Sequence, residues 1–474
     1  MSTHDEAAQS FAVKRAQVEF HNFASLGEPE RALAHYEDEN RRRARIIERN
    51  RDFIGTITPF LEIGANAGHT SYMLANQFGG EGFALDISAD ALRHGIALMD
   101  RWKLSRAPVR VAGDALNLPF RDGSLRFVMA CQVLSQFMDI ESVFVEVNRV
   151  LMPGGVFLFT EEPLRRRLTL RLYRAPYQDR MKPWERKLFD WGLLGYLVRD
   201  VIGAEQEESF GIRQNHRMYL GDWRRVMARH FAEIRWELFV PERGWGERIV
   251  KRAVRSDWRA AKLLGGTLAG MCRKAGTAPT AGDMPPFETL LRCPDCHVGQ
   301  AFSLSQAEGL SHPCGYRATD DGGVYNLLPT KLRAELYPGD RADVIDFSLP
   351  GHSERLRDGW SDLEGEFGNR YRWIGARATA VLHSVSRGAP RLRVRGFAHP
   401  GQFEKGHPVV DLTVNGTRVA RHSLERVGLF VIEADLPDAE TYTVEIAASP
   451  TWTIPEDDRI FSVNISMVRL VGRE

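Results

Sequence analysis

The residues that most constrain the fold are the segment FLEIGANAGHT at 60–70 and the acidic residue that follows at Asp86. An apolar strand runs into a turn of small residues, and a second apolar strand ends at Asp86, eighteen positions after Gly68. Small residues let backbone N–H groups approach a ligand at a helix N-terminus, and a carboxylate accepts hydrogen bonds from ribose hydroxyls. The pattern therefore predicts an α/β protein that binds a nucleoside.

The turn does not fit the dinucleotide fingerprint G-x-G-x-x-G. Counted from Gly64, the second and third glycine positions hold Asn66 and His69. Asn is one of the few non-glycine residues that tolerate a positive φ, so it suits a tight turn. The turn therefore points to a different nucleoside ligand.

The order of motifs over 60–160 resembles that of class I S-adenosylmethionine-dependent methyltransferases, whose first motif is E-x-G-x-G-x-G. Glu62, Gly64 and Gly68 match this motif, and Asn66 replaces the middle glycine. This resemblance implies a Rossmann-like methyltransferase fold with S-adenosylmethionine as the cofactor.

Later segments follow in the family's order, with GDA at 113–115, LPFRDGS at 118–124 and LMPGG at 151–155. In the family, the acid that ends the second strand binds the ribose and its neighbour packs on the adenine. The GDA segment contacts the adenine amino group and ring. The resemblance therefore assigns cofactor binding to Glu62, Gly64, Ala65, Asn66, Gly68, Asp86, Ile87, Asp114, Ala115 and Gln132.

The same resemblance implies a methyltransferase domain over 58–275 and an N-terminal helical lid over 1–57. Two features near the acceptor depart from the family. Arg126 stands where an acidic residue is usual, and 133–136 reads VLSQ where V-L-x-H is usual. We expect an intact cofactor pocket beside altered acceptor-side positions.

An insertion at 164–200 interleaves arginine and lysine with aromatic residues, and its apolar stretch lies at 193–198. Basic and aromatic side chains in one amphipathic segment suit the headgroup region of a bilayer, which would give a peripheral membrane contact. The alternative is a helical cap with a solvated basic face that packs on the sheet. The sequence leaves both interpretations open.

A Pro/Gly-rich linker at 276–286 precedes a cysteine motif. Cys293 and Cys296 form a C-x2-C pair, and Cys314 follows eighteen residues after Cys296. A complete four-cysteine zinc site would repeat the pair, but the partner position holds Ser311. Three thiolates therefore remain.

Histidine is the natural fourth ligand, with His312 as the first candidate and His297 as the second. The segment 290–329 resembles the small zinc-ribbon family that activates tRNA and protein methyltransferases, and it shares that family's tail in DGGVYNLLP at 321–329. We expect a zinc-ribbon-like domain over 287–332. Its structural zinc would be bound by Cys293, Cys296, His312 and Cys314; the alternative is a degenerate ribbon that folds on hydrophobic contacts.

From 340 to 474 the apolar residues alternate with a period of two, and Asn415-Gly416 between two such runs is a hairpin signal. Strands at this spacing without helices predict an all-β sandwich. The region resembles a jelly-roll module of bacterial enzymes that assemble cell-surface polysaccharide, which suggests a carbohydrate-binding-like role. Trp360, Trp373 and Trp452 would either offer flat faces to sugar rings or fill the core.

Composition excludes some classes of function. Lysine plus arginine number 63 against 62 acidic residues, so bulk nucleic-acid binding is not expected. Only five cysteines occur, which argues for a reducing compartment. The N-terminus lacks a signal-peptide pattern, and no apolar run is long enough to span a bilayer. We expect a cytoplasmic protein, peripheral at the inner face of the membrane if the insertion binds lipid.

The combined expectation is a methyltransferase that O-methylates a sugar, a glycan or a lipid-linked glycan intermediate of cell-surface polysaccharide, with other polysaccharide-assembly enzymes as partners. An oxygen acceptor needs a general base, and the candidates are His216, His21 and Tyr36, although an ordinary structural role would explain each of them. Two alternatives stand beside this: a non-catalytic or partner-dependent cofactor-binding scaffold, and a protein or tRNA methyltransferase that carries its activator ribbon in cis.

Overall fold

The structure is a computed structural model of the 474-residue chain, and it describes most of residues 29–472. Two longer gaps in this description cover 202–217 and 240–265. Shorter gaps fall at 138, 166–169, 171, 176–180, 192, 281, 306–308, 319, 321, 338, 348, 366–369, 386–387, 426 and 456.

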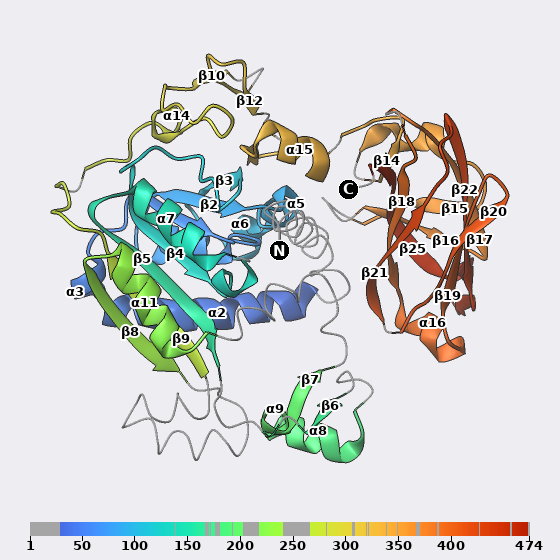
Figure 1. Ribbon diagram of the computed structural model, residues 1–474, viewed down its shortest axis with the longest axis horizontal. Coiled ribbons are helices and arrows are strands. Elements are labelled where there is room, and N and C mark those ends of the chain that lie inside the picture. Colours follow the sequence, from blue (N-terminus) through green and yellow to red (C-terminus); the bar gives the residue numbers. More distant parts are fainter. Residues whose placement is uncertain are drawn as a thin grey trace. The chain divides into compact units, whose positions relative to one another are not determined.

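The described chain divides into two compact units, one ending at Thr330 and the other beginning at Lys331. The first unit is built on one eight-stranded sheet with the order β13-β3-β2-β1-β4-β5-β9-β8. Figure 1 labels β3, β2, β4, β5, β9 and β8 of this sheet. Its strands are β1 (Phe60–Ile63), β2 (Gly82–Asp86), β3 (Val109–Ala112), β4 (Leu125–Cys131), β5 (Leu151–Leu164), β8 (Glu233–Phe239), β9 (Gly266–Arg273) and β13 (Tyr325–Asn326).

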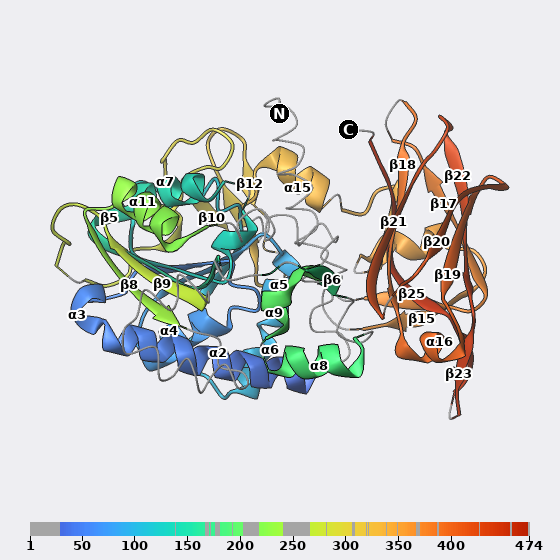
Figure 2. The ribbon, with the colours of Figure 1, turned by 60° about the horizontal axis from the view of Figure 1, so that its bottom comes forward.

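Neighbouring strands from β13 to β5 run parallel, whereas β9 and β8 pair antiparallel at the far end. The carboxyl ends of β1, β2 and β4 therefore meet at one edge, where open α/β sheets bind their ligands. Helices lie on both faces of this sheet (Figure 2). They are α2 (Pro29–Arg49), α3 (Arg51–Ile54), α4 (His69–Gln77), α5 (Ala89–His94), α6 (Ala97–Arg101), α7 (Ile140–Val150) and α11 (Leu220–His230).

Alternation along β5 explains the two helical layers, because successive side chains of a strand point to opposite faces. Phe157 and Phe159 belong to the buried cluster that holds α7 and α11 against the sheet. Val156 and Leu158 belong to a second buried cluster with α2, α3 and α4. A near-continuous apolar strand is therefore buried on both faces.

The cysteine-containing segment joins the first unit rather than forming a core of its own. It contains α14 (Phe287–Leu290), β10 (Ser303–Ser305), β11 (Gly309–Ser311) and β12 (Arg317–Ala318), and it leads through β13 into α15 (Thr330–Leu336). Its buried side chains Leu310 and Tyr316 belong to the same apolar cluster as the sheet. β13 extends the parallel sheet beyond β3, with Tyr325 opposite Val111.

The linker before this segment is also held against the sheet. The Arg126 guanidinium donates to the carbonyl oxygens of Pro279 and Thr280 at 2.9 and 3.3 Å, and to that of Thr58 at 3.1 Å. The unusual arginine before the fourth strand thus has a structural role.

The insertion folds into a small element of its own within the first unit. β6 (Tyr173–Ala175) pairs parallel with β7 (Val198–Val201), and the helices α8 (Pro183–Asp190) and α9 (Leu194–Leu197) lie between them in the chain. Met181 and Leu194 are buried together at its centre.

After α15, which begins at the boundary between the units, the described residues of the second unit are all-β apart from the short helix α16 (Pro400–Lys405) and a 3-10 turn, η4 (Pro350–Arg355). One sheet has the order β15-β16-β25-β18-β21 with β14 paired to β25, and the other has the order β17-β22-β19-β20. Buried side chains from both sheets form one cluster, so the two sheets pack around a shared core. The strands are β14 (Val344–Asp346), β15 (Trp360–Glu364), β16 (Tyr371–Ile374), β17 (Arg377–His383), β18 (Arg391–Ala398), β19 (Val409–Val414), β20 (Thr417–Ser423), β21 (Gly428–Asp435), β22 (Thr441–Ser449), β23 (Trp452–Ile454), β24 (Asp457–Phe461) and β25 (Val463–Val471).

The predicted hairpin lies where the sequence placed it, between β19 and β20, with positive φ at Asn415 and Gly416. Two of the three tryptophans are core residues, and Trp360 is half-buried against the core of the sandwich. Trp373 and Trp452 are buried beside Phe461, and the Trp360 indole N–H donates to the backbone of Thr379 at 2.7 Å. No helix within the described residues is long and apolar enough to cross a membrane.

Candidate functional site

A cleft with about 1060 Å³ of empty space, part of it open to solvent, lies at the carboxyl ends of β1, β2 and β4. Eight of the ten residues predicted to bind the cofactor line this cleft, and Ala65 and Gly68 belong to the adjacent turn without lining it. The eight are Glu62, Gly64, Asn66, Asp86, Ile87, Asp114, Ala115 and Gln132.

The turn after β1 depends on a close backbone approach. Gly64 has φ +67°, and a Cβ at this position would lie 2.4 Å from a methyl carbon of Val133 in the loop after β4. Only glycine therefore lets the two loops meet. Asn66 has φ +51°, as expected for the residue that replaces the middle glycine.

Asp86 is the carboxylate at the end of β2, and its side chain is fixed by backbone donors. The N–H of Asn66 donates to one carboxylate oxygen at 2.8 Å, and the N–H of Ser88 donates to the other at 2.8 Å. A carboxylate oxygen has two lone pairs, so both oxygens retain acceptor capacity toward the cleft. The arrangement suits a pair of ribose hydroxyls.

Glu62 contributes to the cleft and also holds the first turn of α4. Its carboxylate accepts from the N–H of Ser71 at 2.7 Å and from the Ser71 hydroxyl at 2.5 Å. Burial raises the pKa of Glu62 to about 7, although these hydrogen bonds act in the opposite direction. The residue therefore caps a helix whose N-terminus faces the cleft.

Another wall of the cleft is formed by residues 113–116, which follow β3. The N–H of Gly113 donates to the Asp86 carbonyl oxygen at 2.8 Å, and the N–H of Leu116 donates to the Asp114 carboxylate at 3.0 Å. The cysteine-containing segment holds both ends of this wall. The N–H of Leu327 donates to the Ala112 carbonyl oxygen at 2.8 Å, and the Asn117 side chain donates to the Pro294 carbonyl oxygen at 2.9 Å.

Sequence reasoning missed a buried ionic network that attaches α2 to the cleft. Arg43 is 3% exposed and donates to the Glu161 carboxylate at 3.1 and 2.8 Å and to the Thr70 hydroxyl at 2.7 Å. Its guanidinium also lies 2.9 Å from the His69 ring, which in turn lies 2.8 Å from the Glu39 carboxylate. Glu39, Arg43 and His69 all line the cleft.

Burial opposes ionisation in this network, but its charges compensate one another. The pKa of Glu39 is lowered to about 2 because the His69 hydrogen bond and the Arg43 charge outweigh its burial. The pKa of His69 is lowered, chiefly by burial, which favours the neutral ring. Three consecutive arginines at 41–43 were the only local signal for this network.

A second missed residue is Glu162, which is fully buried at the end of β5. Its carboxylate accepts from the backbone N–H groups of Val133, Leu134 and Ser135 at 2.9, 2.8 and 2.9 Å. Those residues open the 3-10 turn η1 (Leu134–Gln136), which lies on the cleft wall together with Phe137. Glu162 therefore fixes the loop at 133–136 on the wall of the cleft.

Of the three general-base candidates, only Tyr36 lies within the described residues; His21 and His216 lie outside them. The Tyr36 ring stacks on the His69 ring with centroids 4.3 Å apart. Burial raises the pKa of Tyr36 to about 12, so its phenol stays protonated at neutral pH. Tyr36 also lies off the lining of the cleft.

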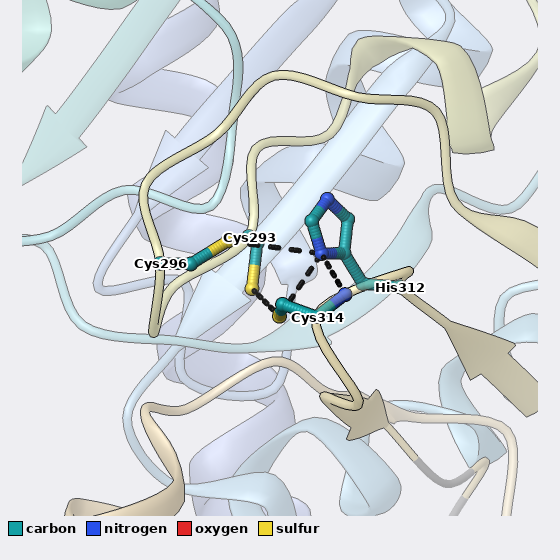
Figure 3. Close-up of side chains that lie close together, drawn as sticks. All are labelled: Cys293, Cys296, His312 and Cys314. Atoms are coloured by element: carbon teal, nitrogen blue, oxygen red, sulfur yellow. Dashed lines mark hydrogen bonds between the residues drawn. The ribbon is translucent and has the colours of Figure 1, made fainter.

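The predicted metal ligands come together in the cysteine-containing segment. One ligand atom from each of Cys293, Cys296, His312 and Cys314 lies within 4.8 Å of the others (Figure 3). The Cys293 and Cys314 sulfurs are 3.6 Å apart, and the His312 Nδ1 atom lies 3.1 Å from the Cys314 sulfur. His297 is not part of this cluster.

These distances fit a tetrahedral zinc ion, because Zn–S bonds of about 2.3 Å place two sulfurs about 3.8 Å apart. The Val298 N–H lowers the pKa of the Cys296 thiol and so favours the thiolate form. Burial has the opposite effect on Cys293, whose pKa is raised to about 12. Three sulfurs and one imidazole are a common structural zinc set, and the donor chemistry fits that metal.

Comparison with known proteins supports the interpretation of the first unit. Residues 61–159 match the family model described as "Methyltransferase domain". Phosphoethanolamine N-methyltransferase 2 of Caenorhabditis elegans is 31% identical over 26% of this chain and 27% of its own length. A protein of Mycolicibacterium smegmatis named "Probable S-adenosylmethionine-dependent methyltransferase/" is 29% identical over 38% of this chain and 69% of its own length.

Among solved structures, phosphoethanolamine N-methyltransferase 2 of Haemonchus contortus in complex with S-adenosyl-L-methionine shares 17% identity, with a TM-score of 0.30. That match covers 47% of this chain and 50% of that one. The chain spans 27%, 41% and 18% of three of its curated relatives. The prediction of a methyltransferase domain is confirmed for this part of the chain.

Proposed function

We propose that the chain binds S-adenosylmethionine in the cleft and transfers its methyl group to an acceptor. The observation that carries this proposal is the Asp86 carboxylate, fixed by two N–H groups at the mouth of the Gly64 turn inside a confirmed methyltransferase domain. A carboxylate held in this way suits the two hydroxyls of a ribose as a hydrogen-bond acceptor, because a pre-oriented side chain loses little entropy on binding.

The residues of the cleft divide the work of holding the cofactor. Asp86 accepts from the ribose, Ile87 packs on the adenine, and Asp114 with Ala115 contacts the adenine edge. S-adenosylmethionine supplies, when bound, an electrophilic methyl group on its sulfonium. Methyl transfer is an in-line displacement, so the protein's task is to align the acceptor and exclude water. The walls formed by α2 and by the Glu162-fixed loop serve that task.

For the acceptor, we propose a sugar hydroxyl of a glycan or lipid-linked glycan. The support is the second unit, an all-β region that resembles a polysaccharide-assembly module. A hydroxyl acceptor must lose its proton as it attacks. We propose His216 or His21 for that step, because the high pKa of Tyr36 makes its phenol a poor base. Mass spectrometry of surface glycans from cells with and without the gene tests this acceptor.

The first experiment is titration calorimetry with S-adenosylhomocysteine. Asp86→Ala should weaken binding by about tenfold or more, because hydrogen bonds to a charged group contribute about 1.5–3 kcal/mol. Asp86→Asn preserves the size of the side chain but removes the charge and one of the two oxygens that accept from the turn, so it should also weaken binding. Asp100→Ala, at an exposed position of α6, is the matched control and should leave binding unchanged. Unchanged binding in both Asp86 variants would refute the assignment.

A second candidate function is methylation of a protein or tRNA, with the ribbon acting as an activator in cis. The observation that favours it is the pairing of β13 with β3, directly before the wall of the cleft. The non-catalytic scaffold is less favoured, since Arg126 contacts the linker and does not line the cleft. Incubation of fractionated cell extract with the chain and labelled S-adenosylmethionine distinguishes these functions. Label would appear in glycan, in protein or in tRNA according to the acceptor, and in none of them if the chain is a non-catalytic scaffold.

A further inference from the structure

The element formed by the insertion exposes an unusual set of apolar side chains. Leu172 is 69% exposed, Leu170 is 66% exposed and Trp184 is 49% exposed. Elsewhere in the described residues, large exposed apolar side chains are scattered along the chain. Within 24 consecutive positions the insertion contributes Leu170, Leu172, Trp184, Phe189, Trp191 and Leu193.

The exposed charges on α8 and its N-cap are all basic within the described side chains. Lys182, Arg186 and Lys187 are exposed, whereas Glu185 is 4% exposed and turned inward. The Glu185 carboxylate accepts from the Lys182 N–H at 2.8 Å and so caps the helix. Glu185 is therefore used inside the element, and the described exposed charges of this helix and its N-cap are positive.

The basic and apolar groups are mixed rather than separated. The Lys187 ammonium lies 5.0 Å from the centre of the Trp191 ring, and the Tyr173 and Trp184 rings are 5.9 Å apart. Tryptophan beside lysine suits the level of lipid headgroups, where the ring is half-buried and the amine meets phosphate. Exposed leucines add side chains that reach the acyl boundary.

We propose that this surface, comprising the six apolar residues and Lys182, Arg186 and Lys187, docks on an anionic lipid bilayer. Single-stranded nucleic acid suits it less well, because bases stack on aromatic rings but gain little from Leu170, Leu172 and Leu193. A second copy of the chain also suits it less well, since a two-fold contact would bring like charges together. This proposal does not depend on the proposed methyl transfer.

The test is cosedimentation of the full chain with vesicles of phosphatidylcholine alone or mixed with phosphatidylglycerol. We expect binding to the mixed vesicles that weakens with added salt, and little binding to the neutral ones. Lys182→Gln with Lys187→Gln should weaken binding about fivefold for each lysine. Trp184→Ser with Trp191→Ser should weaken it about tenfold for each ring.

Matched controls make the same changes elsewhere. Lys331→Gln with Lys405→Gln removes two exposed lysines, and Val298→Ser with Ile460→Ser removes two exposed apolar side chains. Both controls should bind vesicles as the wild type does, and circular dichroism checks the fold of every variant. Absence of binding to anionic vesicles would overturn the proposal, as would equal losses in variants and controls. Binding of RNA or self-association lost only in the insertion variants would assign the surface to another occupant.

Discussion

At the level of single residues, the cleft contains some residues that a local sequence pattern predicts and others that only contacts distant in the chain place there. Asp86 and Asn66 could be predicted because each stands at a fixed position in a strand-turn-helix unit. The adjacent acids Glu161 and Glu162 could not be told apart from sequence. One pairs with Arg43, 118 positions away, and the other accepts from backbone N–H groups 27 to 29 positions away.

Glu162 leads to a prediction about pH. Burial raises its pKa from 4.5 to about 7, while the unfolded chain keeps the lower value. Between these values the folded protein holds a proton that the unfolded protein has released. The contribution to the free energy of unfolding is therefore fully present below pH 4.5 and is lost as the pH rises to about 7, by roughly 3 kcal/mol in total.

The measurement is urea unfolding of wild type and Glu162→Gln at a series of pH values. The free energy of unfolding of the variant should fall less between pH 4.5 and 7 than that of the wild type. A part of the fall should remain, because the pKa of Glu62 is also raised. Glu48→Gln, at an exposed position of α2, should follow the wild type. Parallel curves for wild type and Glu162→Gln would contradict the raised pKa.

At the level of elements, the cysteine-containing segment was predictable as a motif but not in its placement. The spacing of Cys293, Cys296 and Cys314 indicated a ribbon with a fourth ligand to be supplied. Its attachment to the cleft wall uses contacts between residues far apart in the chain, such as Asn117 to Pro294 over 177 positions, together with a shared apolar core. A two-residue strand such as β13 is too short for its hydrophobic pattern to predict which strand it pairs with.

The metal prediction has two readouts. Elemental analysis of the purified chain should find zinc, and Cys314→Ser or His312→Ala should remove it, whereas His297→Ala should retain it. Loss of the metal loosens contacts that hold both ends of the wall at 113–116, so S-adenosylhomocysteine affinity should fall about three- to tenfold, the worth of one or two hydrogen bonds. A metal-free wild type whose melting temperature is unaffected by chelators would show that the cysteine-containing segment folds without zinc.

At the level of the whole molecule, the all-β region could be predicted from the period-two alternation of apolar residues that begins after the cysteine-containing segment. Such alternation is a local property of the sequence. The pairing order of the strands in that region was not predictable, because β25 at the end of the chain lies between β16 and β18. Each unit has buried clusters of its own, which predicts separate unfolding.

Differential scanning calorimetry should therefore resolve two transitions. S-adenosylhomocysteine at about a hundred times its Kd should stabilise the first unit alone, by about 2.7 kcal/mol. Gly416→Ala should lower the free energy of unfolding of the second unit alone, by about 1 kcal/mol. The cost comes from the backbone, because φ is +79° at this position and an added methyl group meets no neighbour. A single transition that responds to both changes would show that the units unfold together.

The pairing of β13 with β3 has a consequence for anyone who shortens this chain. A fragment that stops at the linker keeps every residue of the cofactor cleft, yet it removes β13 from the edge of β3 and leaves the Ala112 carbonyl oxygen without the Leu327 N–H that donates to it. An uncovered strand of that kind is a template for intermolecular pairing and aggregation. The cysteine-containing segment thus covers the edge of the sheet in the first unit, and expression trials should retain it through Leu327.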